Sequence, residues 1–362
     1  MADAKVIPFG DGSGKRPRGR GTGRGGGHER PAGAGRPPLR PVPEPGAGGG
    51  SGPADGSGAG SGGSFDAGGA RPGDGGGRPE DGRPGWEERI ASGLAFLRRR
   101  VTGEYEVDDF GYDKDLTDQV LMSLIRPVYE NYFRVEVKGI ENIPSEGGAL
   151  VVANHSGTLP LDGLMMQVAV HDHHPADRHL RLLAADLVFM LPVVNELARK
   201  AGHTLACAED AEELLGRGEV VGVMPEGFKG LGKPFAERYK LQRFGRGGFV
   251  STALRAGVPI VPCSIVGAEE IYPMLGNSKT LARLLGIPYF PLTPTFPWLG
   301  PLGVVPLPTK WTIQFGAPIA TDGYPPEAVE DPMLMFNLTD QVREQIQHTL
   351  YKLLVQRRSV FF

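Results

Sequence analysis

Short apolar segments alternate with segments of helical periodicity over most of the chain from residue 135 onward. Each short segment holds four to six residues, most of them rich in Val, Ile, Leu or Ala, which is typical of buried strands. The predicted strands cover residues 135–138, 149–153, 180–184, 220–224, 260–265 and 312–315. Helices are predicted between them over residues 163–170, 193–200, 211–215 and 248–256. This alternation predicts an α/β fold with a mixed, largely parallel sheet flanked by helices.

Longer amphipathic helices are predicted on both sides of this alternation. Apolar residues recur every three or four positions within 116–132 and again within 336–356. A further helix is predicted over 86–100, where three arginines at the end suit a helix C-terminus. Its apolar face has two open interpretations, which are packing in the core and contact with a membrane.

Residues 1–85 form a low-complexity segment of Gly, Pro, Arg, Ser and Asp with almost no large apolar side chains. The chain holds 55 glycines and 33 prolines, and much of that excess lies in this segment. Such a composition cannot bury enough apolar surface to offset its chain entropy, so we predict a disordered N-terminal tail. The chain therefore divides into this tail, an N-terminal helical segment (86–133) and one large domain (134–362).

No segment has the pattern of a membrane-spanning helix. The longest uncharged run lies between Arg283 and Lys310, but its seven prolines rule out a continuous helix. We predict an apolar loop over 284–309, whose aromatic residues, Trp298 among them, suit a lipid interface. A lid packed on the sheet is the alternative interpretation.

Net charge and cysteine content limit which partners and which cellular compartment we expect. The net charge of −3 makes no electrostatic case for nucleic acid as a partner. Only Cys207 and Cys263 are present, which excludes a disulfide framework and fits a reducing cytoplasm. No charged-then-apolar signal peptide opens the sequence. The expected location is the cytoplasmic face of a membrane, in peripheral contact with it.

The second predicted strand leads directly into Asn154, His155, Ser156 and Gly157, and Asp162 opens the next helix. Ligands of α/β proteins bind beyond the carboxyl ends of such strands. A carboxylate that accepts the Nδ1 proton of His155 would leave Nε2 able to take a proton from an attacking hydroxyl. These two residues are therefore candidates for general-base catalysis. The alternative is a polar turn followed by an ordinary helix N-cap.

A second polar loop follows the fourth predicted strand. It reads Pro225-Glu226-Gly227 and then carries Lys229, the first of six basic residues within eighteen positions. Backbone N–H groups and fixed positive charge suit a phosphate or a pantetheine-type carrier. Arg246 lies among glycines that open the next helix, where the backbone permits close approach of a ligand. A solvated basic loop is the alternative interpretation.

A group of histidines is a candidate metal site. His171, His173 and His174 surround Asp172, and His179 follows shortly after. Imidazole and carboxylate are common metal ligands. No metal-spaced cysteine supports the group, and neighbouring loop histidines are more often solvated. We therefore predict no metal and no cofactor.

The order of the two catalytic motifs resembles that of the phospholipid/glycerol acyltransferase superfamily. The residues that carry the resemblance are Asn154-His155 through Asp162, Pro225-Glu226-Gly227 and Val258-Pro259-Ile260-Val261-Pro262, with an opening phrase at 137–144. The resemblance covers roughly 135–321 and implies a glycerol-phosphate-acyltransferase-like fold. It also implies transfer of a fatty acyl group from acyl-CoA or acyl carrier protein to a hydroxyl of a lysophospholipid or a mono- or diacylglycerol.

The resemblance also implies a role for each motif residue. His155 becomes the catalytic base and Asp162 its partner, while Glu226 and Gly227 belong to the acceptor site. The expected substrate-binding residues are Asn154, Ser156, Gly157, Pro225, Glu226, Gly227, Lys229 and Arg246. The hydroxyl would attack the thioester directly, and backbone N–H groups near Gly157 or Gly227 would hold the oxyanion.

The chain departs from the family pattern in three places. Six residues separate His155 from Asp162, where the family usually has four, and this spacing is closer to the mono- and diacylglycerol acyltransferase-like members. Ala206-Cys207-Ala208 stands where the family has an arginine for the acceptor phosphate, and Lys229 replaces another arginine. A lysophospholipid and an acceptor without phosphate therefore both stay open.

Two other classes of function would use the same residues. A hydrolase of lipid esters or thioesters would use the same base with water in place of the alcohol. The sequence holds no Gly-x-Ser-x-Gly elbow, which argues against a serine hydrolase. A non-catalytic lipid-binding protein would account for the altered spacing between His155 and Asp162.

Overall fold

The computed structural model describes residue 98 and residues 106–156, 159–190, 192–245, 247–287 and 289–362. The predicted tail, the predicted helix at 86–100 apart from Arg98, and the site residues Gly157 and Arg246 lie outside the described residues. All described residues belong to the same structural unit.

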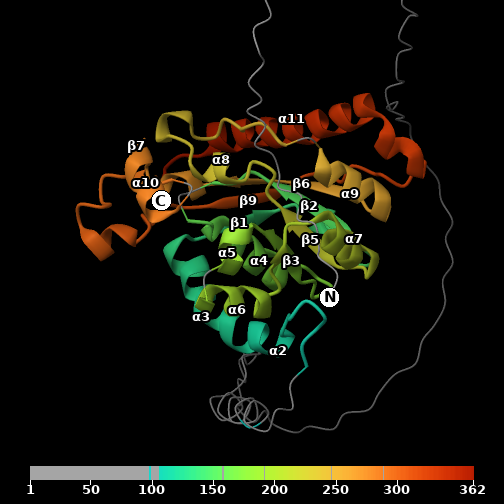
Figure 1. Cartoon of the computed structure of the whole chain (residues 1–362), viewed down its shortest axis with the longest axis horizontal. Coiled ribbons are helices and arrows are strands. Elements are labelled where there is room, and N and C mark those ends of the chain that lie inside the picture. Colours follow the sequence, from blue (N-terminus) through green and yellow to red (C-terminus); the bar gives the residue numbers. More distant parts are fainter. Residues whose placement is uncertain (1–97, 99–105, 157–158, 191, 246, 288) are drawn as a thin grey trace, which may run out of the picture. The chain divides into compact units, whose positions relative to one another are not determined.

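A seven-stranded sheet in the order β1-β9-β6-β2-β5-β3-β4 forms the centre of the fold (Figure 1). Neighbouring strands are parallel except β6 and β9, which run antiparallel. The strands are β1 (Glu136–Lys138), β2 (Ala149–Ala153), β3 (Leu180–Ala184), β4 (Thr204–Leu205), β5 (Val220–Val223), β6 (Ile260–Val266) and β9 (Thr312–Phe315). The prediction of a mixed, largely parallel sheet is confirmed. The sequence pattern missed only β4 of this sheet, because a two-residue strand leaves no periodicity.

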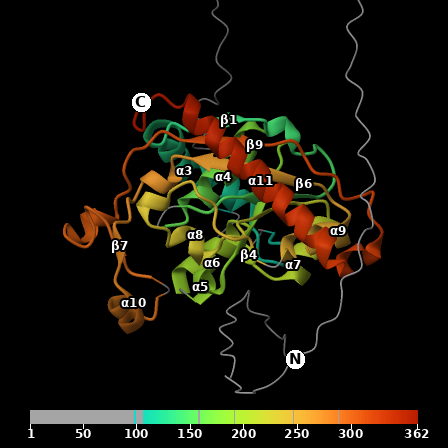
Figure 2. The same cartoon turned by 90° about the horizontal axis from the view of Figure 1, so that it is seen from above.

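Helices cover both faces of the sheet, and α11 crosses one face along much of its width (Figures 1 and 2). The longer helices are α4 (Leu161–His173), α6 (Pro192–Lys200), α7 (Ala208–Gly216), α9 (Gly248–Ala256) and α11 (Pro332–Gln356). Each contains the helix predicted from periodicity. Helix α11 begins earlier than predicted because Asp331 accepts hydrogen bonds from the N–H groups of Met333 and Leu334, and Pro332 suits the first position.

The two faces of β2 contribute to different halves of the core. Ala149, Val151 and Ala153 belong to the cluster that includes residues of α4, whereas Leu150 and Val152 belong to the cluster that includes residues of α7, α9 and α11. Every residue of β2 and of β6 is buried. A strand that is covered on both faces appears in the sequence as an unbroken apolar run, which is why these strands were predictable.

The helix predicted at 116–132 is present as one continuous helical segment. It comprises α2 (Lys114–Leu116), the π-helical turn η1 (Thr117–Leu121), α3 (Met122–Pro127) and the π-helical turn η2 (Val128–Tyr132). The side chain of Asp113 caps its start by accepting a hydrogen bond from Leu116 N at 2.9 Å. Met122 and Tyr129 are buried in the same cluster as α4, so this segment packs against that side of the sheet.

The predicted apolar loop at 284–309 contains regular structure that the sequence analysis did not predict. Helix α10 (Lys279–Leu285) ends in it, and β8 (Pro291–Leu292) pairs antiparallel with β7 (Gly276–Asn277). In Figure 2, α10 and β7 lie at one end of the described unit, beyond α8. The remaining short elements are α5 (Asp186–Met190), α8 (Phe228–Leu231), η3 (Ile140–Asn142), η4 (Phe235–Glu237), η5 (Ala268–Glu270), η6 (Gly300–Val304) and η7 (Pro326–Glu330). Of the helices in the described ranges, none is long and apolar enough to cross a membrane.

Candidate active site

The two predicted motifs meet at one edge of the sheet. His155 follows β2 and Glu226 follows β5, and these strands are parallel neighbours with Val152 opposite Val223. The carboxyl ends of parallel neighbours meet at the same edge. The backbone N–H of His155 donates a hydrogen bond to Glu226 Oε1 at 3.0 Å, so the motifs are in direct contact.

The imidazole of His155 and the carboxylate of Asp162 form a buried hydrogen-bonded pair. Nδ1 of His155 lies 2.8 Å from Asp162 Oδ2. The same oxygen accepts a hydrogen bond from Ser156 N at 2.8 Å, while Oδ1 accepts one from Gly163 N at 2.9 Å. Asp162 is fully buried and His155 is 9% exposed. The contact orients the ring, because a carboxylate beside Nδ1 favours the tautomer whose proton lies on that nitrogen.

The two extra residues between the histidine and the aspartate do not prevent this contact. Leu159 and Pro160 are both exposed, so the added length loops outward as the spacing requires. Asp162 then lies in the first turn of α4, where a carboxylate is favoured by the helix dipole. Among the residues that the structure describes, no group hydrogen-bonds to Nε2 of His155.

Asn154 and Gly230 position His155 from two sides. The Asn154 amide donates to the backbone oxygen of Ile265 at 3.0 Å and accepts from Ile265 N at 2.7 Å, which ties the end of β2 to β6. A Cβ at Gly230 would lie 2.6 Å from the backbone oxygen of His155, so α8 approaches the histidine as closely as a glycine permits. Asn154 was predicted to bind substrate, but its described contacts are with the backbone of β6.

Glu226 also serves the backbone in this structure. Besides His155 N, its carboxylate accepts a hydrogen bond from Gln242 N, and Oε2 lies 3.6 Å from Lys233 Nζ. The next residue, Gly227, has φ +53° and ψ −144°, a conformation that glycine adopts far more readily than other residues. The N–H of Gly227 itself donates to the backbone oxygen of Met224. The expectation that N–H groups near Gly157 or in the Gly227 loop hold an oxyanion stays a prediction.

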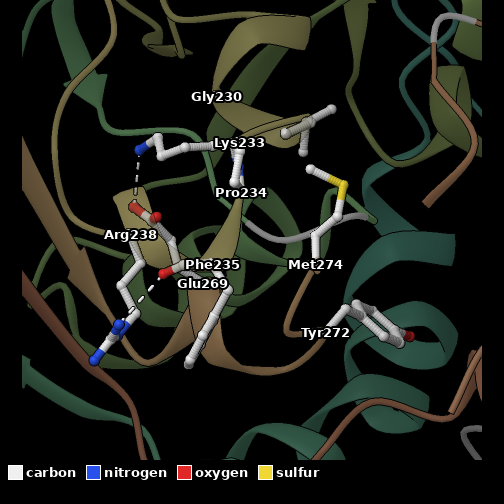
Figure 3. A pocket seen from close by; sticks show the side chains of 9 residues that line it. Gly230, Lys233, Pro234, Phe235, Arg238, Glu269, Tyr272 and Met274 are labelled. Atoms are coloured by element: carbon white, nitrogen blue, oxygen red, sulfur yellow. Dashed lines mark hydrogen bonds and ion pairs between the residues drawn. The ribbon is translucent and has the colours of Figure 1, made fainter. Parts of the chain in front are cut away.

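A buried charge network extends from Glu226 away from the histidine. Lys233 Nζ lies 3.1 Å from Glu269 Oε1 (Figure 3). Glu269 Oε2 accepts a hydrogen bond from Tyr239 N at 2.9 Å. Burial raises the pKa of Glu269 to about 7, although the neighbouring Lys233 ammonium acts in the opposite direction. One ammonium thus serves two carboxylates. Lys233 is 7% exposed, so the alternative interpretation of a solvated basic loop does not hold for this residue.

An open pocket lies beside this network. Its empty space amounts to about 240 Å³, part of which is open to solvent. Its lining combines charged and apolar side chains, which Figure 3 shows converging from several elements. The residues are Gly230, Leu231, Lys233, Pro234, Phe235, Arg238, Glu269, Tyr272 and Met274. Gly230 contacts His155 and also lines this pocket, so the pocket adjoins the histidine.

The remaining predicted substrate residues differ in exposure. Lys229 is exposed and Pro225 is half-buried. Ser156 is fully buried, and its hydroxyl has no hydrogen-bond partner among the described residues. Gly157 and Arg246 lie outside the described residues, so their predicted roles stay predictions.

Tyr289 joins the site from the segment that was predicted to be a loop. Its ring would lie 3.7 Å from a Cβ at Gly232, just beyond α8. Burial, and then the charge of Asp162, raise the pKa of Tyr289 to about 12. The segment at 284–309 therefore reaches the neighbourhood of the His155–Asp162 pair, which its apolar composition alone did not indicate.

The histidines that were set aside as solvated are all in polar contact. His173 Nε2 lies 3.0 Å from the Tyr129 hydroxyl, and the buried His174 lies 3.0 Å from the backbone oxygen of Ile143. His171 and His179 both contact Asp118, a residue of η1 that the sequence analysis did not connect with them. The prediction of solvated loop residues is wrong for His171, which lies within α4 and is half-buried, and for His174, which is buried, whereas His173 is exposed.

Comparisons with known proteins agree with this arrangement. A family model described as "Acyltransferase" matches residues 134–266, which span β1 to β6. An uncharacterized protein of Mycobacterium tuberculosis is 62% identical over 273 residues, covering 75% of this chain and 76% of its own length. A "DGAT1/2-independent enzyme synthesizing storage lipids" from Bos taurus is 27% identical over 187 residues, covering 52% of each chain.

A solved structure is also similar in part. The 1-acyl-sn-glycerophosphate acyltransferase PlsC of Thermotoga maritima matches with a TM-score of 0.46 and 20% sequence identity, covering 75% of this chain and 90% of its own. The chain belongs to the acyltransferase family. The family match contains both motifs, His155 with Asp162 and Pro225-Glu226-Gly227.

Proposed function

We propose that the protein is a glycerolipid O-acyltransferase that moves a fatty acyl group from a thioester to a lipid hydroxyl. The donor is acyl-CoA or acyl carrier protein. His155 is the general base and Asp162 orients it. The observation that carries this proposal is the 2.8 Å contact between His155 Nδ1 and the fully buried carboxylate of Asp162.

In the proposed reaction, Nε2 of His155 removes the proton of the acceptor hydroxyl as its oxygen attacks the thioester carbonyl. The tetrahedral oxyanion collapses with cleavage of the carbon–sulfur bond, and the thiolate takes the proton from the imidazolium. The products are an ester and a free thiol, and the histidine regains its starting tautomer. The buried carboxylate of Asp162 stabilises the transient imidazolium and does not itself need to be protonated.

For the acceptor, we favour a neutral acylglycerol over a lysophospholipid. Lys233 is already paired with Glu226 and Glu269 at 3.6 and 3.1 Å, so its charge is engaged by carboxylates. Ala206-Cys207-Ala208 also offers no fixed positive charge after β4. A phosphate dianion is bound most strongly by paired cationic donors, and neither Lys233 nor residues 206–208 supply a free one. The named activity of the relative from Bos taurus, synthesis of storage lipids, is in line with this choice.

We further propose that the segment around α10 and η6 contacts the membrane, so that the protein is peripheral to it. Large apolar side chains there are unusually exposed, including Leu284 at 79%, Trp298 at 74% and Leu302 at 71%. A lid packed on the sheet would bury these side chains. Tyr289 lies between them in the sequence and near Asp162 in space, which would connect a lipid surface with the catalytic pair.

The test is acyl transfer by the full chain from an acyl-CoA in the presence of a diacylglycerol, a monoacylglycerol or lysophosphatidate. We expect ester product with wild type, most with a neutral acceptor, and none above background with His155→Ala. Release of free fatty acid at the same rate without any acceptor would identify a hydrolase instead. Absence of thioester cleavage under every condition would support a non-catalytic lipid-binding protein.

A further inference from the structure

A second cluster of histidines and carboxylates lies at the opposite end of α4 from Asp162. Asp118 comes from η1, His171 from the last turn of α4, and His179 immediately precedes β3. Asp118 Oδ1 lies 3.1 Å from His171 Nε2 and 2.9 Å from His179 Nε2. The three ligand atoms lie within 4.8 Å of one another, and all three residues are half-buried.

We propose that Asp118, His171 and His179 form a binding site for a divalent zinc-like cation that joins the N-terminal helical segment to the domain. Two imidazole nitrogens and one carboxylate oxygen are a ligand set that zinc accepts, with a fourth position left for water. Ligands around a tetrahedral zinc ion lie about 3.3 Å apart, because each bond is about 2.0–2.1 Å long. The two separations from Asp118 Oδ1, 3.1 and 2.9 Å, are close to this value, and the two histidine nitrogens lie within 4.8 Å of each other.

The contacts of the two ring nitrogens of His171 support this proposal. Its Nε2 faces Asp118 and its Nδ1 lies 2.6 Å from Asp172 Oδ1, so both ring nitrogens face carboxylates. A neutral imidazole has one N–H and can donate to only one of them. A metal on Nε2 would leave the ring proton on Nδ1, from which it can be donated to Asp172.

Asp172 gives His171 the outer contact that metal-ligating histidines usually have. Such a histidine typically donates its second N–H to a carboxylate that is itself held in place. Here Arg126 donates to both oxygens of Asp172, from Nε and from Nη2, each at 2.7 Å. The Arg126–Asp172–His171 chain therefore fixes the ring while neutralising the outer carboxylate. Arg126 belongs to α3, so the chain spans the same two layers as the proposed ligands.

The surroundings leave room for a coordinated water. A small pocket that is partly open to solvent is lined by both ligand histidines. Tyr112 also lines it, and its buried hydroxyl has no hydrogen-bond partner among the described residues. Burial, followed by the charge of Asp118, raises the pKa of this phenol, which keeps it a donor. A water in the fourth position of the ion would give the hydroxyl a partner.

The experiment measures metal uptake by the full chain carrying an affinity tag without histidines. Protein freed of metal with EDTA is incubated with ZnCl₂, passed over a desalting column and analysed for bound zinc, and its affinity is measured by calorimetry. We expect one strongly bound zinc per wild-type chain. His171→Gln, His179→Gln and Asp118→Asn should each lose this binding. Asp172→Asn should weaken it about 10- to 100-fold.

His173→Gln is the matched control, because His173 lies on the same helix but contacts the Tyr129 hydroxyl rather than Asp118. It should bind zinc as wild type does. If a ligand variant fails to fold, the visible absorption spectrum of wild type with added Co²⁺ is measured instead. Binding at the proposed site should give absorption bands, because two imidazoles would coordinate the ion. Wild type that retains no zinc, or ligand variants that retain as much as the control, would overturn the proposal. The cluster would then be a set of ion pairs around a protonated His171.

Discussion

A histidine–aspartate pair lies at each end of helix α4. The two pairs differ in how many nitrogens of the histidine ring are in contact with a carboxylate. At its start, Asp162 is fully buried and contacts one nitrogen of His155, and no described group contacts the other. At its end, both nitrogens of His171 face carboxylates, those of the half-buried Asp118 and of Asp172. A base needs one nitrogen able to accept a proton, whereas a ligand or ion pair uses both. Similar residue types therefore suit catalysis at one end and binding at the other.

The strongest test of this comparison removes the base. His155→Ala should lower the rate of acyl transfer about 10²- to 10⁴-fold, because that is the usual contribution of a positioned general base. The rate is measured by ester formation from acyl-CoA, and thermal unfolding confirms that the variant is folded. His348→Ala, at an exposed position of α11, should keep the wild-type rate. Equal rates in wild type and His155→Ala would refute the catalytic assignment of this end of the helix.

A subtler change reverses the hydrogen bond without removing the ring. In Asp162→Asn, the amide NH₂ can donate to Nδ1, which would leave the ring proton on Nε2, where the base must accept. We expect a loss of roughly 10²-fold in kcat. The effect of Asp162→Asn should be absent in a His155→Ala background, since the aspartate acts through the histidine. Independent, multiplicative losses would mean that Asp162 has another role.

The third prediction concerns the exposed apolar segment at 284–309, which lies near the His155–Asp162 end of α4. Replacing Trp298 and Leu302 by Ser should lower binding to liposomes roughly tenfold or more, because each buried apolar side chain is worth about 1.5–3 kcal/mol. Flotation with liposomes measures this. Phe336→Ser removes a comparably exposed aromatic residue from α11 and serves as the control, since Phe336 is 62% exposed. Unchanged flotation of the double variant would place the membrane contact elsewhere.

The smallest expected effect concerns the network behind His155. Burial raises the pKa of Glu269 from its ordinary value of 4.5 to about 7, so the folded protein binds this proton more tightly than the unfolded chain. This group therefore stabilises the fold most at low pH, and its contribution decreases as the pH rises from about 4.5 to about 7. Glu269→Gln should flatten that part of the Tm profile by a few degrees. A profile unchanged from wild type would show that the carboxyl does not titrate there.

Much of the fold followed from local patterns. The unbroken apolar runs of β2 and β6 identified strands that are buried on both faces, and the period of α9 gave its limits, Gly248–Ala256. The weaker predictions concerned segments whose structure depends on neighbours. Strand β8 lies in a proline-rich run and forms only because Pro291 and Leu292 pair with β7. No period in the sequence could reveal that pairing.

In the candidate site, too, the residues that are close in the sequence were predicted, and those that are brought together from distant positions were not. His155 and Asp162 are seven positions apart, so chain order alone brought both to notice, and the exposed Leu159 and Pro160 accommodate the unusual spacing. The buried charged residues around His155 and Glu226 could not be predicted from chain order. Lys233 looked like one charge in a basic loop, yet it is buried against Glu269, 36 positions away.

The sequence by itself determined the alternation of strands and helices, the order of the two motifs and the residue types at the ends of β2 and β5. Those features depend on neighbours within a few positions. Only the tertiary structure decided which polar side chains are buried and which partners they meet. Asp118 lies 53 positions from His171 and 61 from His179, and the three converge because η1 packs beside α4 and β3. Burial and distant partners set the charge state of a side chain, so chemistry of this kind appears only once the layers are assembled.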